Sequence, residues 1–312
     1  MKIRSAESSS GQILLLVLLG MAVVLVVALS IVSRSLVDIS LTTLDEDSQR
    51  AFSAAEAGIS KALITGSDLS EAIGNASFSV DVDTLSAGVS AVHPDELVSG
   101  ESIIFWFVPQ NTEGALDCSA GNCFEGNKFK ICWSNDSSIN DFTPAIEASI
   151  FYDAIPGGDY SDVKVVRVTG DANQFARPVD NNFSNVDSGA CSITIEGLTT
   201  DFKFQKLIDL PVITGIADGP GAFYNQQNGL QFMRVKLFYT SQPQQIGFST
   251  QNLPGGSSCN RLNGNCSLPP QGLRIESTGV SGDASRKVEV FQTYGEPPWI
   301  FEGVFSESDI IK

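Results

Sequence analysis

The stretch that decides the fold is ILLLVLLGMAVVLVVALSIV, residues 13–32. It contains no charge and no proline, and a short hydrophilic leader ending in Gly11-Gln12 comes before it. A helix needs about 20 apolar residues to cross the roughly 30 Å hydrocarbon layer of a membrane, whereas the apolar part of a cleaved signal peptide has about 7 to 15. The stretch therefore predicts a membrane-spanning helix.

The helical pattern continues beyond the membrane. Apolar residues recur three or four positions apart after Arg34, which is the spacing of a helix face, and Gly66 is placed like a C-terminal cap. We expect one helix over residues 13–66, which at 1.5 Å per residue is roughly 75 Å long, more than twice the hydrocarbon thickness. Lys2 and Arg4 precede the span and acidic residues follow it, which predicts a cytoplasmic N-terminus with the rest of the chain outside.

The composition agrees with an exported protein. The chain has 312 residues, of which 36 are acidic and 19 basic, and its formal net charge is −17. Such a balance repels phosphate backbones, so we expect no nucleic-acid partner. Six cysteines suit an oxidising compartment.

The cysteines are interpreted as disulfides. Closeness in sequence favours three pairs, although six cysteines allow 15 connectivities. The favoured pairs are Cys118 with Cys123, Cys259 with Cys266, and Cys132 with Cys191. Neither short pair has CxxC spacing and the only histidine, His93, stands beside Pro94, so we expect no metal site of the zinc type.

Beyond residue 66 the pattern changes from helical periodicity to short β-rich runs, separated by segments rich in Asn, Gly, Asp and Pro. The expected strands cover residues 76–82, 102–108, 128–133, 145–152, 163–168, 191–195, 202–210, 230–239, 245–249, 273–279 and 287–292. The chain therefore predicts an α+β fold in which one long N-terminal helix is followed by antiparallel sheets.

Three features occur in a recognisable order: the leader ending in Gly11, the long apolar helix, and the string AFSAAEAG at residues 51–58. Over about residues 8–66 they resemble the N-terminal helix of PilX-type pilus assembly proteins. These are accessory or minor pilins of the type IV pilus and type II secretion superfamily. Residues 279–290 resemble the closing hairpin of the same proteins, and residues 297–301 resemble their C-terminal tail.

The resemblance implies a single-span membrane precursor whose leader is cut after Gly11 by a prepilin peptidase, so that Gln12 becomes the first mature residue. It also implies packing with other pilin-like subunits in a filament or its initiating complex. We expect no cofactor, and the surface ligand is left open. The fifth mature residue is Leu16, where major pilins carry glutamate. This difference points to an initiating or tip subunit, or to a subunit that is never processed.

The family pattern also implies an architecture. Residues 1–12 form the leader and residues 13–66 the helix, which packs on an antiparallel pilin-like sheet. Residues 67–100 and 222–312 supply that sheet and a C-terminal tail, and residues 101–221 form an inserted β-sandwich. The alternative is a single-span, membrane-anchored extracellular adhesin or carbohydrate-binding protein.

Small residues form a stripe on the expected helix, three, four or seven positions apart, which allows another backbone to approach closely. The string also contains one acid, and the candidate packing residues are Ala51, Ala54, Ala55, Glu56, Gly58 and Ala62. One interpretation is packing against the helix of another subunit. The other, which we favour, is that the sheet of the same chain rests on the stripe.

No catalytic residues emerge, so we expect no enzyme. The sequence has no G-x-S-x-G elbow and lacks a Ser-His-Asp arrangement. Ser161 and Lys164 fit S-x-x-K by chance, and no spacing selects a pair of acids for glycoside hydrolysis.

Two binding sites are also considered. Asp180, Asn181, Asn182 and Asp187 place oxygen ligands in one loop, as Asp81 and Asp83 do at a strand end, but no EF-hand pattern is present and solvated turns are favoured. Several aromatic residues could line a sugar-binding face, although alternating positions in strands favour a core. These are Trp106, Trp133, Trp299, Phe105, Phe107, Phe151 and Tyr152.

Overall fold

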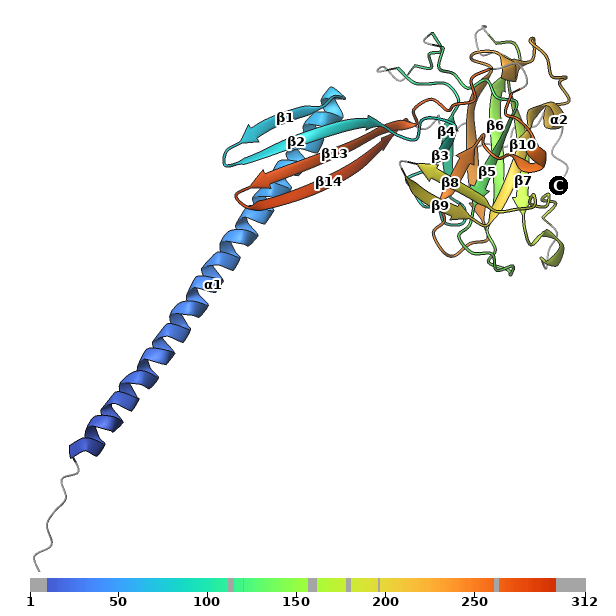
Figure 1. The fold of residues 1–312 in the computed structure, drawn as a ribbon. Coiled ribbons are helices and arrows are strands. Elements are labelled where there is room, and N and C mark those ends of the chain that lie inside the picture. Colours follow the sequence, from blue (N-terminus) through green and yellow to red (C-terminus); the bar gives the residue numbers. More distant parts are fainter. Residues whose placement is uncertain are drawn as a thin grey trace, which may run out of the picture. The chain divides into compact units, whose positions relative to one another are not determined.

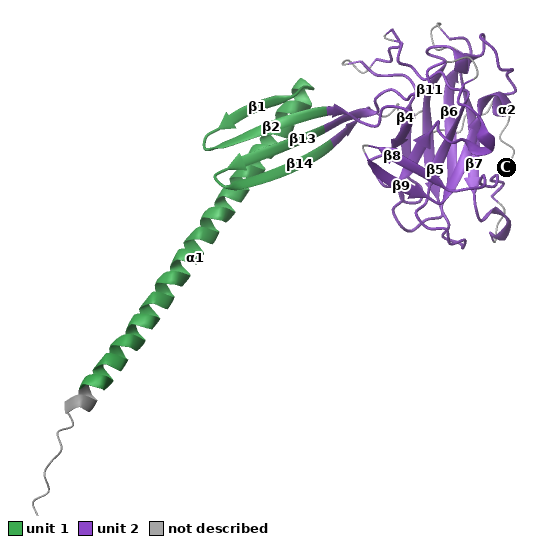
Figure 2. Cartoon of the chain, in the orientation of Figure 1, with its two compact units in different colours: residues 1–82, 275–290 green, residues 83–274, 291–312 purple. Residues whose placement is uncertain are grey.

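The computed structural model describes residues 10–111, 115–119, 121–156, 162–177, 181–195, 197–260 and 264–295, with the backbone alone for residues 10–13. The chain divides into two compact units (Figure 2). Unit 1 consists of Met1–Val82 and Ile275–Val290, and unit 2 consists of Asp83–Arg274 and Phe291–Lys312. Each unit is described by itself below.

Unit 1 contains the long helix α1 (Ser10–Thr65) and an antiparallel sheet in the order β1-β2-β13-β14 (Figure 1). The strands are β1 (Leu69–Ile73), β2 (Ala76–Thr84), β13 (Gly272–Ser281) and β14 (Ala284–Thr293). The expected helix is confirmed, and its first half is long and apolar enough to span a membrane. Gly66 ends α1 in the left-handed region (φ 62°), where its N–H donates to the Ala62 carbonyl at 2.7 Å.

The turn between β13 and β14 is fastened to α1. Ser281 Oγ donates to Asp47 Oδ1 at 3.2 Å, and Arg286 Nε donates to Ser48 Oγ at 2.8 Å. Gly282 takes the positive φ of 52° that this tight turn requires. The hairpin expected over residues 279–290 lies here, whereas the tail expected over residues 297–301 lies outside the described residues.

Unit 2 is built on two antiparallel sheets and a hairpin, in the orders β10-β5-β12-β3, β4-β11-β6-β7 and β8-β9. The strands are β3 (Ser90–Val92), β4 (Ser102–Trp106), β5 (Lys128–Trp133), β6 (Ala145–Asp153), β7 (Val163–Asp171), β8 (Cys191–Ile195), β9 (Leu198–Phe202), β10 (Phe204–Asp209), β11 (Leu230–Phe238) and β12 (Ile246–Ser249). The short helix α2 (Leu210–Thr214) follows β10 directly. The coarse prediction of an α+β chain with antiparallel sheets is confirmed.

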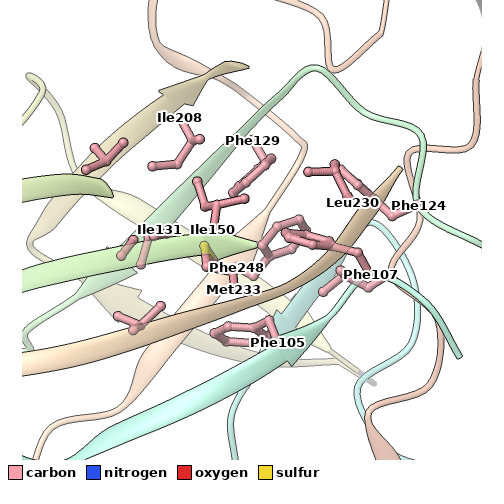
Figure 3. Packing of buried hydrophobic residues seen from close by; sticks show 14 of the residues in the cluster. Phe105, Phe107, Phe124, Phe129, Ile131, Ile150, Ile208, Leu230, Met233 and Phe248 are labelled. Atoms are coloured by element: carbon pink, nitrogen blue, oxygen red, sulfur yellow. The ribbon is translucent and has the colours of Figure 1, made fainter. Parts of the chain in front are cut away.

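Both sheets of unit 2 contribute to one hydrophobic core (Figure 3). Phe129 and Phe248 come from the first sheet, and their ring centroids are 5.1 Å apart. Phe105, Ile150 and Met233 come from the second sheet and are fully buried. Burial of this many large side chains supplies the main stabilisation of the unit.

The division into units differs from the expected boundaries. We expected β11 and β12 to join the sheet on the helix, but β11 pairs with β4 and β6, and β12 pairs with β3 and β5. Unit 2 therefore extends over 83–274 rather than 101–221. The physical reason is core membership, because Met233 of β11 and Phe248 of β12 are buried in the core of unit 2.

Candidate functional site

The first candidate site is the stripe of small residues on α1 in unit 1. Ala55, Gly58 and Ala62 are buried. A Cβ built on Gly58 would overlap Ser277 Oγ of β13 and lie 2.8 Å from Phe78 Cδ2 of β2. The sheet of unit 1 therefore rests directly on the stripe.

Gly279 of β13 shows the same close approach between the sheet and α1. A Cβ built on Gly279 would overlap the carbonyl oxygen of Ala51 and lie 2.7 Å from the amide nitrogen of Ala55. Ala54 is nearly buried, whereas Glu56 is exposed. Packing of the stripe on the chain's own sheet is thus confirmed, and Glu56 is the one candidate packing residue that the sheet leaves exposed.

A second surface on α1 lies between the apolar run and unit 1's sheet. Val37, Leu41 and Leu44 recur at positions i, i+4 and i+7, so they share one helix face, which we call the outer apolar stripe. Their exposed fractions are 55%, 56% and 46%. Within the described chain nothing covers this stripe. It also lies beyond residues 13–32, which alone are long enough to cross a membrane.

The leader site lies at the start of α1. The helix begins at Ser10, so the backbone of Gly11 and Gln12 is helical, and their side chains lie outside the described residues. Cleavage between these two residues stays a prediction. The same holds for the orientation of the helix in the membrane.

The structure joins the six cysteines in the three pairs that the sequence favoured. Cys132–Cys191 links β5 to β8 across a sequence separation of 59, with the two Cα atoms 6.0 Å apart. The remaining two bridges close short loops, with sequence separations of 5 and 7. All three bridges lie in unit 2, and this arrangement suits an oxidising compartment.

The aromatic candidates separate into two groups. Phe105, Phe107, Trp133 and Tyr152 belong to the core of unit 2, as the alternation in the strands favoured. Trp106 and Phe151 belong instead to a second cluster, with Ile104 and Phe232, on the other face of the sheet that contains β4 and β11. Trp299 lies outside the described residues.

A groove of about 750 Å³ lies over this second cluster. Three cations, Arg167, Arg234 and Lys236, line it together with four carboxylates, those of Asp95, Glu96, Glu101 and Glu147. Glu147 Oε1 is 3.8 Å from Arg167 Nε. Trp106 contributes to the floor but is only 6% exposed, so the rings offer little face for stacking. The groove therefore suits a polar ligand better than one that stacks on the aromatic rings. Sequence reasoning missed these cations, although Arg234 and Lys236 alternate along one strand face.

The residues that were weighed for metal binding make contacts within the protein. His93 packs edge-on against Phe105, and burial lowers its pKa despite the nearby charge of Asp95. In the loop that was considered for calcium, where solvated turns were favoured, Asn181 Nδ2 donates to Asp171 Oδ2 at 2.8 Å, and Asp187 accepts the N–H of Leu207 at 2.5 Å. The described residues contain no group of three or more His, Cys, Asp or Glu placed to hold a metal.

Two residues that were considered above, Ser161 of the S-x-x-K match and Asp180 of the loop considered for calcium, lie outside the described residues.

Comparison of the chain with protein-family models, with curated proteins and with solved structures finds no match. The function therefore has to be argued from the two surfaces described above.

Proposed function

We propose that this chain is an accessory, pilin-like subunit of a type IV pilus or a related surface filament. In this proposal α1 anchors the subunit in the membrane with its N-terminus in the cytoplasm. The sheet of unit 1 is the pilin-like sheet on the helix, and unit 2 is an inserted β-sandwich presented outside. The membrane and other pilin-like subunits are the partners, and the chain carries no catalytic activity.

The observation that carries the proposal is the exposed apolar length of α1. From Leu14 to Leu44, helix geometry gives about 45 Å, which exceeds the roughly 30 Å hydrocarbon thickness. Over this length large apolar side chains are about half exposed or more, including Val37 and Leu41. A simple anchor needs the membrane-spanning part alone. The apolar residues beyond it have to be covered by something else, and a neighbouring subunit's helix fits their spacing.

The small-residue stripe supports the same proposal. Because Ala51, Ala55 and Gly58 hold the sheet close to one face of α1, they leave the other faces of the helix free for neighbours. In the core of a helical filament the subunits pack through their helices, so each subunit has to expose helix surface there. In unit 1 the sheet covers one face of α1 and leaves the other faces exposed.

The test is site-specific photocrosslinking in the native cell. A photoreactive residue at position 41 should give adducts with pilin-like subunits. The same residue at position 42, which points about 100° away around the helix, should give far fewer. Thr42 is a suitable control because it is exposed and its hydroxyl donates to the Asp38 carbonyl of the same helix. Equal, lipid-only labelling at both positions would contradict packing between subunits.

A second candidate function, that of a membrane-anchored adhesin, is favoured by the groove in unit 2. Because three cations and four carboxylates line this groove, a polar ligand such as a glycan matches the site. The discriminating experiment compares binding of acidic and neutral glycans by the full chain. Glycan binding that is lost in Arg234→Gln, together with a wild type that does not associate with filaments, would favour the adhesin.

A further inference from the structure

Strand β4 forms one edge of its sheet in unit 2, and β11 is its neighbour on the other side (Figure 2). The N–H of Phe107 donates to the Gln231 carbonyl, and the N–H of Leu237 donates to the Glu101 carbonyl. The odd-numbered residues in and around β4 therefore bond to β11, and the backbone groups of the even-numbered residues point away from it. Among the described residues no strand pairs with that second side.

A side chain already pairs with one residue of this edge. The N–H of Trp106 donates to Gln271 Oε1 at 2.7 Å, and Gln271 Nε2 donates to the Trp106 carbonyl at 2.9 Å. The amide of this buried glutamine thus replaces one residue of a neighbouring strand. The N–H and C=O groups of Ser102 and Ile104 face the same way, and no hydrogen bond within the described chain satisfies them.

The groove of about 750 Å³ runs along this edge. Its lining includes each residue from Gly100 to Ile104, together with Trp106 and Gln271. A strand presents donors and acceptors to one side at every second residue, roughly 7 Å apart. An extended peptide carries the matching groups at the same repeat, and it binds such an edge by adding to the sheet as a further strand.

The wall of the groove on the core side of β4 is acidic. It is formed by residues 93–101, and the ring of His93 packs edge-on against Phe105, which belongs to the core of unit 2. The carboxylates that this segment contributes to the lining are those of Asp95, Glu96 and Glu101. An added strand would therefore face acids with every second side chain.

The wall on the outer face of the sheet is mainly basic. Arg167, Arg234 and Lys236 line it, and Glu147 adds one carboxylate. Lys236 lies directly opposite Ser102 of β4, so only a small side chain separates it from the edge. The remaining side chains of an added strand would face these cations.

We propose that the edge of β4 binds an extended segment of a partner protein, which adds to the sheet as a strand. Because the side chains of a strand alternate between two faces, the segment that fits has basic side chains toward residues 93–101 and acidic or polar ones toward Lys236. This edge would bind its partner whether or not the chain belongs to a filament.

Two rival occupants match the charges less well. The β4 of a second copy has no charged residue, so it would leave both walls without a counter-charge. Residues 296–312 of the chain itself contain four acids and a single base, Lys312, and so lack the repeated bases that the acidic wall requires.

The experiment measures how a fluorescein-labelled peptide, KTKEKTKE, binds the full chain in nonionic detergent micelles, by fluorescence anisotropy. When this peptide is extended, its lysines share one face and its threonines and glutamates the other. The control peptide KKKKTETE has the same composition but places lysines on both faces. We expect saturable binding of the first peptide, about tenfold tighter than the control. Equal affinities, or no saturation of either below about 1 mM, would overturn the proposal.

Hydrogen exchange locates the bound peptide. The amides of Ser102 and Ile104 should exchange more slowly when KTKEKTKE is saturating, because they then donate to the peptide. Unchanged exchange in β4 at saturation would overturn the assignment to this edge.

A pair of variants tests the backbone of β4. Ser102→Pro removes the N–H that points into the groove, a change that edge strands tolerate, whereas Ser102→Ala keeps that N–H. Ser102→Pro should weaken binding of KTKEKTKE about tenfold, and Ser102→Ala should leave it unchanged. Equal affinities in two variants with the same melting temperature would contradict pairing along β4.

A second pair of variants tests the acidic wall. Glu96→Gln should weaken binding of KTKEKTKE a few-fold, since it removes one counter-charge for the lysines. The matched control is Asp201→Asn, which removes an exposed carboxylate bonded to Ser192 on β8. Because both variants change the net charge equally, equal losses would show that attraction to the whole chain, and not to this wall, holds the peptide.

The two rival occupants give results of their own. If residues 296–312 occupied the edge, KTKEKTKE would bind only to a chain shortened to end at Gly295. If a second copy occupied it, the wild type would sediment as a dimer and Ser102→Pro as a monomer. We expect equal peptide affinity in the full and the shortened chain, and a wild-type monomer. Either rival result would overturn the assignment to a partner protein.

Discussion

Unit 1 and unit 2 are stabilised in opposite ways. In unit 1 the sheet lies against a helix face made of small residues, and Gly58 and Gly279 let the backbones approach closely. In unit 2 large aromatic side chains such as Trp133 and Phe129 fill the space between two sheets, and three disulfides join its loops and strands. The stability of unit 1 should therefore fall when side-chain volume is added, and that of unit 2 when side-chain volume is removed.

The largest effect is expected from emptying the core of unit 2. Trp133 is fully buried, and its Nε1 donates to the Pro144 carbonyl at 2.9 Å. Trp133→Ala should destabilise the unit by about 5 kcal/mol, at the upper end of the range for such truncations. Phe142→Ala, at a side chain that is 68% exposed, should change stability by less than about 0.5 kcal/mol. Urea unfolding followed by circular dichroism measures both, and similar losses would contradict the assigned core.

The contribution of each disulfide should rise with the logarithm of the length of the loop it closes. Replacing Cys132 and Cys191 by serine should cost about 4 kcal/mol in the chain-entropy model, against about 2 kcal/mol for Cys118 and Cys123. A peptide map of the exported protein establishes whether the bridges form, and unfolding of the two double variants then compares them. Six free thiols would remove both this expectation and the argument for an oxidising compartment.

Unit 1 should respond to added volume instead. Gly279→Ala places a Cβ against the carbonyl oxygen of Ala51, and a backbone atom cannot move aside cheaply, so we expect a loss of about 1–3 kcal/mol. The neighbouring exposed residue provides the control, since Val280→Ala should be nearly neutral. Hydrogen exchange of peptides from α1 and β13 reports on unit 1 directly. Unchanged protection in Gly279→Ala would contradict the close packing.

The smallest effect concerns the acid stability of unit 2. Burial raises the pKa of Asp171, but hydrogen bonds from Arg177, Asn173 and Asn181 and the charge of Arg177 outweigh it, so the pKa lies below its ordinary value. The stabilisation is therefore present above the unfolded pKa of about 3.9 and is lost as the pH falls through the folded pKa.

The stability of the wild type should therefore fall as the pH is lowered through the folded pKa of Asp171. Asp171→Asn should remove this part of the slope of stability between pH 5 and pH 2, as should Arg177→Gln, which takes away the charge. Unfolding in urea at a series of pH values measures the slope. A full wild-type slope in Asp171→Asn would show that other groups cause the acid sensitivity.

The sequence predicted some parts of the molecule well because their signals are local. Helix α1 follows from a continuous periodicity that ends at Gly66, and β5 and β8 follow from short apolar runs between turns. Membership of a sheet is not local. The alternation in β11 shows that it is a strand, but nothing in it tells whether its partner is β13 or β4, so the boundary of unit 2 was misplaced.

The missed features have physical reasons as well. Strand β1 has the sequence LSEAI and is mostly exposed, so no buried face leaves a pattern in it. The hydrogen bond from Asn127 to Asp218 joins residues about 90 positions apart, and only the fold brings them together. The small-residue stripe and its packing on the chain's own sheet were predicted, but the close approach of the backbones at Gly58 and Gly279 was not.

The most direct test of the proposed function is mass spectrometry of filaments sheared from the cell surface. The account predicts that the chain is present in the sheared fraction at low abundance and that its mature form begins at Gln12. Replacing Gly11 with leucine should retain the leader and remove the chain from the filaments. A wild-type chain that keeps Lys2 and Arg4 and stays entirely in the membrane fraction would contradict the account and favour the anchored adhesin.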